Sequence, residues 1–102
     1  MSASLQDELA AFGRARINAL KSLGPTALRE LPKIQSEDVT VCGKKIMVTV
    51  YRDGLPDSRV LIVIQIYRRV FLFYGRMFVV GFIVESSGQI SEAESKVLLD
   101  YS

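Results

Sequence analysis

The spacing of apolar residues changes once along the chain, from a helical period to a strand period. At 100° per residue, one face of residues 4–22 is apolar and the opposite face is polar, which predicts an amphipathic helix. Ser4 is a suitable N-cap, and Gly24-Pro25 ends the helix because proline cannot continue it. The apolar face is made by Leu5, Leu9, Phe12, Leu20 and Leu23.

From residue 39 onward the apolar residues follow a period of two, which is typical of strands. Strands are predicted at Val39–Cys42, Ile46–Arg52 and Arg59–Tyr67, with residues 33–38 as an extended lead-in. The third predicted strand is apolar on both faces, whereas a strand with one solvent-exposed face would alternate apolar and polar residues. We therefore predict that Arg59–Tyr67 is central, with the helix on one side and another segment on the other.

The most hydrophobic stretch is Val60–Val84, where 19 of 25 residues are apolar. We predict a hairpin here with its turn at Tyr74-Gly75, because glycine suits tight turns. The strands then cover about 59–73 and 76–85, with a bend or bulge at Arg68-Arg69. This register pairs Phe71 with Phe78, Tyr67 with Phe82, Ile66 with Ile83 and Arg68 with Gly81.

The end of the chain carries a helix signal. Ser91-Glu92-Ala93-Glu94 has the spacing of a capping box, in which Ser91 and Glu94 each bond the other's amide. Together these patterns predict one α+β domain over residues 1–102. An N-terminal amphipathic helix packs across a curved antiparallel meander of about four strands, followed by a short C-terminal helix.

The basic and acidic residues are unevenly distributed along this predicted fold. Residues 44–76 carry seven basic and two acidic side chains, a net +5, while residues 1–43 are balanced and residues 77–102 carry −3. These sum to the net charge of +2. The excess positive charge therefore belongs to the predicted strands, where arginines alternate with aromatic residues.

The chain has few of the residue types that usually support catalysis. The chain has no histidine and one cysteine, so sites built on histidine, thiolate zinc sites and internal disulfides are excluded. It has no nucleotide-binding or nucleophile-elbow motif. We expect a protein that is not an enzyme and has no catalytic, cofactor or metal site. Cys42 is expected to be a small buried hydrophobe, and a lone cysteine fits the reducing cytoplasm. Three arginines within Val60–Val84 disfavour a membrane span.

Arg16 interrupts the apolar helix face. One interpretation is that its stem packs while the guanidinium reaches water at the edge of the face. The other is that the guanidinium is held for a carboxylate or an anionic ligand.

The second half of the hydrophobic stretch predicts a partner. Val70–Val80 would project beyond the neighbouring strands, and such an apolar overhang should not stay bare in water. The side chains of this possible interface are Phe71, Leu72, Phe73, Tyr74, Met77 and Phe78.

We expect a binding or assembly module that forms a homodimer through this hairpin. One alternative is nucleic-acid binding, with bases on the aromatic residues and phosphates on Arg68, Arg69 and Arg76. The other is a small-ligand pocket or minor enzyme between helix and sheet, with Arg16 as the anion anchor.

Overall fold

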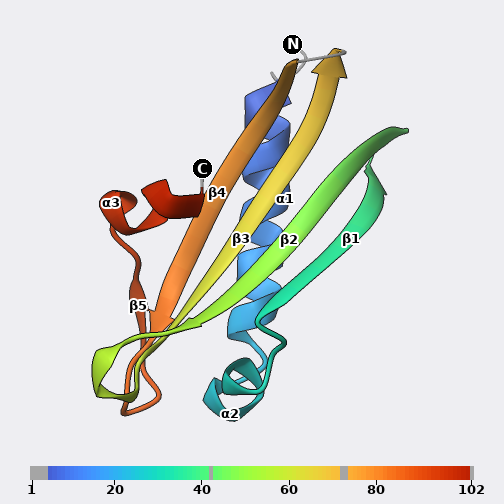
Figure 1. Ribbon diagram of the computed structural model, residues 1–102. Helices are drawn as coiled ribbons and strands as arrows, with labels where there is room; N and C mark the ends of the chain where they lie inside the picture. Colours follow the sequence, from blue (N-terminus) through green and yellow to red (C-terminus); the bar gives the residue numbers. More distant parts are fainter. Residues whose placement is uncertain (1–4, 42, 72–73, 102) are drawn as a thin grey trace.

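The computed structural model describes residues 5–41, 43–71 and 74–101, without the side chains of residues 5, 6, 41, 70, 71 and 74. It is an α+β fold in which helix α1 (Leu5–Lys21) lies behind an antiparallel sheet (Figure 1). The order β1-β2-β3-β4-β5 follows the chain, so the sheet is a meander of five strands rather than about four. The strands are β1 (Ile34–Val41), β2 (Lys44–Gly54), β3 (Val60–Phe71), β4 (Tyr74–Val84) and β5 (Ile90–Glu92). The remaining elements are α2 (Pro25–Arg29), α3 (Ser95–Leu98) and two 3-10 turns at Pro56–Ser58 and Leu99–Tyr101.

Helix α1 confirms the amphipathic prediction to within one residue at each end. Leu9 and Ile17 are buried, and Phe12 and Leu20 pack partly buried against the same core. The helix lies very close to the sheet at Gly13, where an added Cβ would come within 2.7 Å of the Phe78 ring. The face of the sheet against α1 is called the helix face below, and the opposite one the outer face.

Strand β3 is central, as predicted. Its alternate residues Ile62, Ile64 and Ile66 are fully buried in the core on the helix face. On the outer face, Leu61 and Val63 are also buried.

The C-terminal segment supplies the second cover. An added Cβ on Gly81 would meet Leu98 at 3.0 Å and Val63 at 3.3 Å, so α3 lies over β4 and β3 here. The Gln65 side-chain amide donates to the Tyr101 carbonyl, and the rings of Tyr101 and Tyr51 are 5.1 Å apart. Both faces of β3 are therefore covered over this part of its length.

The predicted turn at Tyr74-Gly75 is wrong. Arg69 pairs with Gly75 and Phe71 with Tyr74, so Tyr74 and Gly75 belong to strand β4 and are not the turn. Arg68 lies opposite Arg76 rather than Gly81. The predicted register would have moved Phe82 to the outer face, away from the core. In the observed register Phe78, Val80, Phe82 and Val84 lie on the helix face, opposite Ile66, Ile64, Ile62 and Val60.

Core packing thus outweighs the turn preference of a single glycine. The predicted bulge is close to its expected place, because the register shifts between Arg69 and Phe71.

Two further boundaries differ. Strand β1 begins at Ile34, because the expected lead-in pairs along β2 up to Tyr51. The capping box at Ser91–Glu94 does not form, since Ser91 is in β5 and its hydroxyl bonds the Glu85 carboxylate at 2.7 Å. Glu94 itself is the N-cap of α3 and makes no side-chain cap bond.

Candidate interaction surface at the hairpin end

The outer face carries a row of large side chains near the β3–β4 hairpin. Met47 on β2 pairs with Tyr67 on β3, and Tyr67 pairs with Met77 on β4. Residues directly opposite one another in an antiparallel sheet point to the same face and touch across the strands. Met47 is 40% exposed and Met77 is 37% exposed, with Tyr67 half-buried between them. We call these three residues the Met–Tyr–Met row.

Gly75 fixes the position of Tyr67 in this row. An added Cβ at Gly75 would overlap the Tyr67 ring, so the ring lies across the bare backbone of the neighbouring strand. The sequence suggested that Gly75 was needed for a turn. Its role in the structure is to leave room for an aromatic ring on the outer face.

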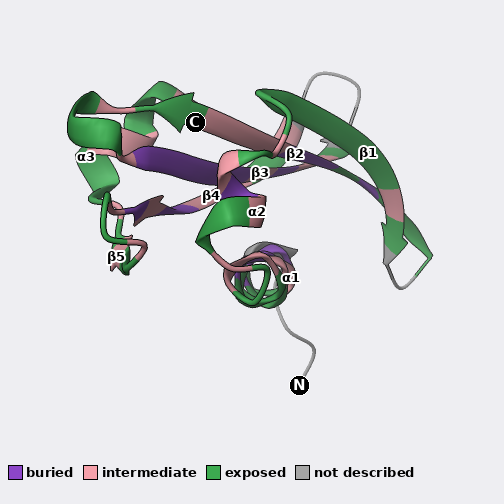
Figure 2. Ribbon diagram, turned by 90° about the horizontal axis from the view of Figure 1, so that it is seen from below, coloured by how far each residue is buried: buried purple, intermediate pink, exposed green. Residues whose placement is uncertain are grey.

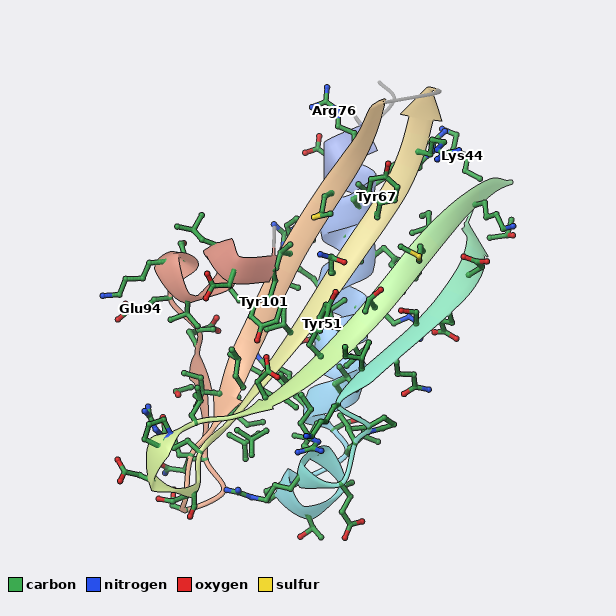
Figure 3. The ribbon with its side chains drawn as sticks, viewed as in Figure 1. Lys44, Tyr51, Tyr67, Arg76, Glu94 and Tyr101 are labelled. Atoms are coloured by element: carbon green, nitrogen blue, oxygen red, sulfur yellow. The ribbon has the colours of Figure 1, made fainter. Side chains whose placement is uncertain are left out.

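Basic side chains lie near one end of the row, on both faces of the sheet: Lys45 and Arg69 alternate onto the outer face, and Lys44, Arg68 and Arg76 onto the helix face. A groove of about 500 Å³ runs beside Met47 and Tyr67, and its lining includes Lys44, Lys45, Arg68 and Arg69. Figure 3 shows Lys44 and Arg76 at the hairpin end of the molecule, with Tyr67 just below them. Lys45 Nζ lies 3.9 Å from an Asp38 carboxylate oxygen, and Lys44 Nζ lies 3.9 Å from one of Glu8. These ion pairs are loose and exposed, so the surface keeps a positive character.

The hairpin projects beyond β2. The pairing of β2 with β3 ends at Met47 and Tyr67, whereas β3 and β4 stay paired as far as Phe71 and Tyr74. The sequence between Arg69 and Gly75 is entirely apolar. Of the predicted interface, Leu72 and Phe73 lie outside the described residues, as do the side chains of Phe71 and Tyr74.

The two remaining predicted interface residues lie on opposite faces. Met77 is exposed on the outer face. Phe78 points to the helix face, where it packs against the core beside Gly13, so the overhang is shorter than expected. The sequence did not identify Met47 as part of this surface, because within its own strand it is only one of several alternating apolar residues. Its position beside Tyr67 follows only from the register of β2 with β3.

The four predicted anion contacts divide between two places. Arg68, Arg69 and Arg76 lie at the hairpin end, with Arg68 opposite Arg76 and Arg69 opposite Gly75. Arg16 lies apart from them, where its Nη1 is 3.2 Å from Glu37 Oε1 and its guanidinium carbon is 5.2 Å from the centre of the Phe12 ring. Its side chain is 40% exposed. It therefore reaches the edge of the apolar face and also meets a carboxylate there.

Within the described ranges, no three of the potential metal ligands His, Cys, Asp and Glu come together. In the same part of the chain, none of the helices combines the length and the apolar character needed to cross a membrane. The predicted role of Cys42 lies outside the described residues. Comparisons of the chain with protein-family models, with curated proteins and with solved structures found no match.

Proposed function

We propose that this protein is a non-enzymatic assembly module whose two copies meet through the outer face of the hairpin end. The observation that carries the proposal is the exposed Met–Tyr–Met row on adjacent strands. Methionine and aromatic side chains are enriched at protein interfaces, and methionine adapts its shape to a partner surface.

A symmetric pair is the simplest occupant because a two-fold axis brings the same patch together from both copies. The patch carries both signs of charge: Asp38 pairs with Met47 at the β1 end of the row, and Arg69 follows Tyr67 by two positions on the same face. Two copies related by a two-fold axis can therefore place Asp38 of each near the basic rim of the other. Salt screens this attraction and also the repulsion between two chains of net charge +2, so the dimer should depend only weakly on salt.

Sedimentation equilibrium tests the proposal. Met47→Glu and Met77→Glu place a buried charge in the dimer and should each weaken association at least about tenfold, since an unpaired buried charge is costly. The matched control is Ile34→Glu, which changes an apolar residue that is 64% exposed at the far end of β1. Equal weakening by all three variants, or none by the methionine variants, would exclude this surface.

Nucleic-acid binding is the second candidate. It is favoured by Tyr67 lying next to the groove lined by Lys45 and Arg69, since an aromatic ring can stack a base while cations hold phosphates. The response to salt separates the two proposals. Affinity for a single-stranded RNA should fall steeply with salt, whereas association of the dimer should change little.

A further inference from the structure

A second recess lies between α1 and the sheet, away from the hairpin end. It has a volume of about 250 Å³. On the sheet side its floor is formed by Val48, Val50 and Ile64, and on the helix side by residues at positions 16, 19, 20 and 23. That helical spacing places all four on one face. The recess is therefore built from the same apolar surfaces that form the core.

The curvature of the sheet explains why space remains here. Figure 2 shows α1 beneath the middle of the sheet, with β1 bending away at the edge and down toward the helix side. The helix packs chiefly on β3 and β4, as the contact of Gly13 with Phe78 and Ile66 shows. The helix therefore covers the helix face of β2 unevenly. Val48 is buried there, whereas Val50 is only half-buried.

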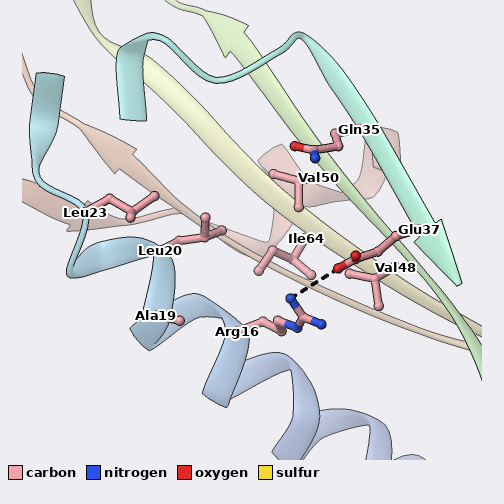
Figure 4. A pocket seen from close by; sticks show the side chains of 9 residues that line it. All are labelled: Arg16, Ala19, Leu20, Leu23, Gln35, Glu37, Val48, Val50 and Ile64. Carbon is pink, nitrogen blue, oxygen red and sulfur yellow. Dashed lines mark ion pairs between the residues drawn. The ribbon is translucent and has the colours of Figure 1, made fainter. Parts of the chain in front are cut away.

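The mouth of the recess is polar. Figure 4 shows Arg16 reaching from α1 across the opening to Glu37 on β1, with Gln35 at the same rim. The ion pair joins one guanidinium nitrogen to one carboxylate oxygen at 3.2 Å, and the two side chains are 40% and 54% exposed. A guanidinium has five N–H donors, and a pair this exposed contributes little to stability. Arg16 can therefore exchange Glu37 for another carboxylate.

We propose that this recess binds a short aliphatic monocarboxylate, with its tail on the accessible lining residues Leu20, Leu23 and Val50 and its carboxylate on Arg16. A recess of about 250 Å³ suits a short chain, and hexanoate serves as the probe. The recess is smaller than the usual site for a drug-sized molecule. This proposal is independent of self-association, because none of its residues belongs to the Met–Tyr–Met row.

The first test compares hexanoate with hexanamide, which has the same size and no charge. In a titration followed by two-dimensional amide NMR, hexanoate should shift the amides of the lining residues. Hexanamide should bind about tenfold more weakly, because a hydrogen bond to a charged group is the stronger kind. Equal affinity of the two, or shifts confined to other parts of the protein, would overturn the proposal.

Charge variants test the anchor. Arg16→Gln should weaken hexanoate about tenfold and leave hexanamide unchanged, whereas the exposed Arg14→Gln on the same helix should change neither. Glu37→Gln removes the competing carboxylate and should strengthen hexanoate binding several-fold. Its control is Glu94→Gln, the same change at an exposed carboxylate that pairs with Lys96 outside the lining of the recess. Weaker binding by Glu37→Gln would contradict the exchange of carboxylates at Arg16.

A filling variant tests the recess itself. Ala19→Leu adds volume from an exposed helix position and should abolish binding of both molecules. Ala11→Leu makes the same change two turns earlier, outside the lining, and should bind both as the parent does. Leucine is a good helix former, so both variants should fold, which circular dichroism checks. Retained binding in Ala19→Leu would overturn the proposal.

Discussion

The two ends of the sheet are closed in different ways. At the end that carries α2, the Arg29 guanidinium donates to the Ser58 carbonyl at 2.6 Å and to the Glu85 carbonyl at 2.8 Å, joining two loops. Tyr101 covers the outer face near the middle of the sheet (Figure 3) and donates its hydroxyl to Asp53, which lies toward this end. At the hairpin end, two exposed ion pairs are 3.9 Å long, Lys45–Asp38 between β2 and β1 and Lys44–Glu8 between β2 and α1, and two methionines face outward. One end is thus closed by hydrogen bonds between loops, and the other leaves apolar side chains exposed.

The largest effect should come from the core that both ends share. Ile64→Ala removes a fully buried side chain and should lower the free energy of unfolding by about 2–5 kcal/mol. Met47→Ala should cost under about 1 kcal/mol in the monomer, since Met47 is largely exposed. Chemical denaturation at low protein concentration separates this from any contribution of association. Similar costs for the two variants would mean that Met47 is part of the core.

The cover over the outer face gives the next effect. Gly81→Ala would bring a Cβ within 2.7 Å of the Ile62 carbonyl oxygen and 3.0 Å of Leu98, so it should destabilise by about 1–3 kcal/mol. Gly54→Ala is the matched control, because a Cβ there meets nothing within 4 Å. It should be neutral or slightly stabilising. A neutral Gly81→Ala would contradict the close packing of α3 on the sheet.

Arg29→Ala should destabilise the end of the sheet that carries α2. It removes two charge-assisted hydrogen bonds to loop carbonyls, but the site is partly exposed, so we expect a loss of about 1–2 kcal/mol. Faster hydrogen exchange in both loops would accompany it, around Ser58 and Glu85. A loss of protection in one loop alone would show that Arg29 does not join them.

Lys45→Ala at the hairpin end should have the smallest effect, about 0–1 kcal/mol, because exposed ion pairs contribute little. Thermal unfolding in low and high salt measures it. A cost as large as that of Arg29→Ala would remove the difference between the two ends.

The sequence predicted most of the architecture, since period and composition mark α1, β2 and the central β3 directly. It failed where a residue has more than one possible role. Gly75 was assigned to a turn, yet it makes room for Tyr67. Ser91 matched a capping box, yet its hydroxyl bonds Glu85 within the sheet.

The candidate surface was predicted only in part for the same reason. Met77 can be picked out from a hydrophobic stretch, but its alignment with Tyr67 and Met47 depends on the register of three strands. Register is decided by side-chain packing on the helix face, which a local pattern does not contain. The pairing of Arg16 with Glu37 likewise depends on how the sheet curves toward α1.

The most direct test of the central claim is sedimentation equilibrium of the full chain across micromolar concentrations. The proposed dimer predicts a mass of about 23 kDa, twice the 11.4 kDa of one chain, that persists as salt is added, and an association at least about tenfold weaker in Met47→Glu. A mass of 11.4 kDa at every concentration and salt level would contradict the proposal that the open hairpin end meets a second copy.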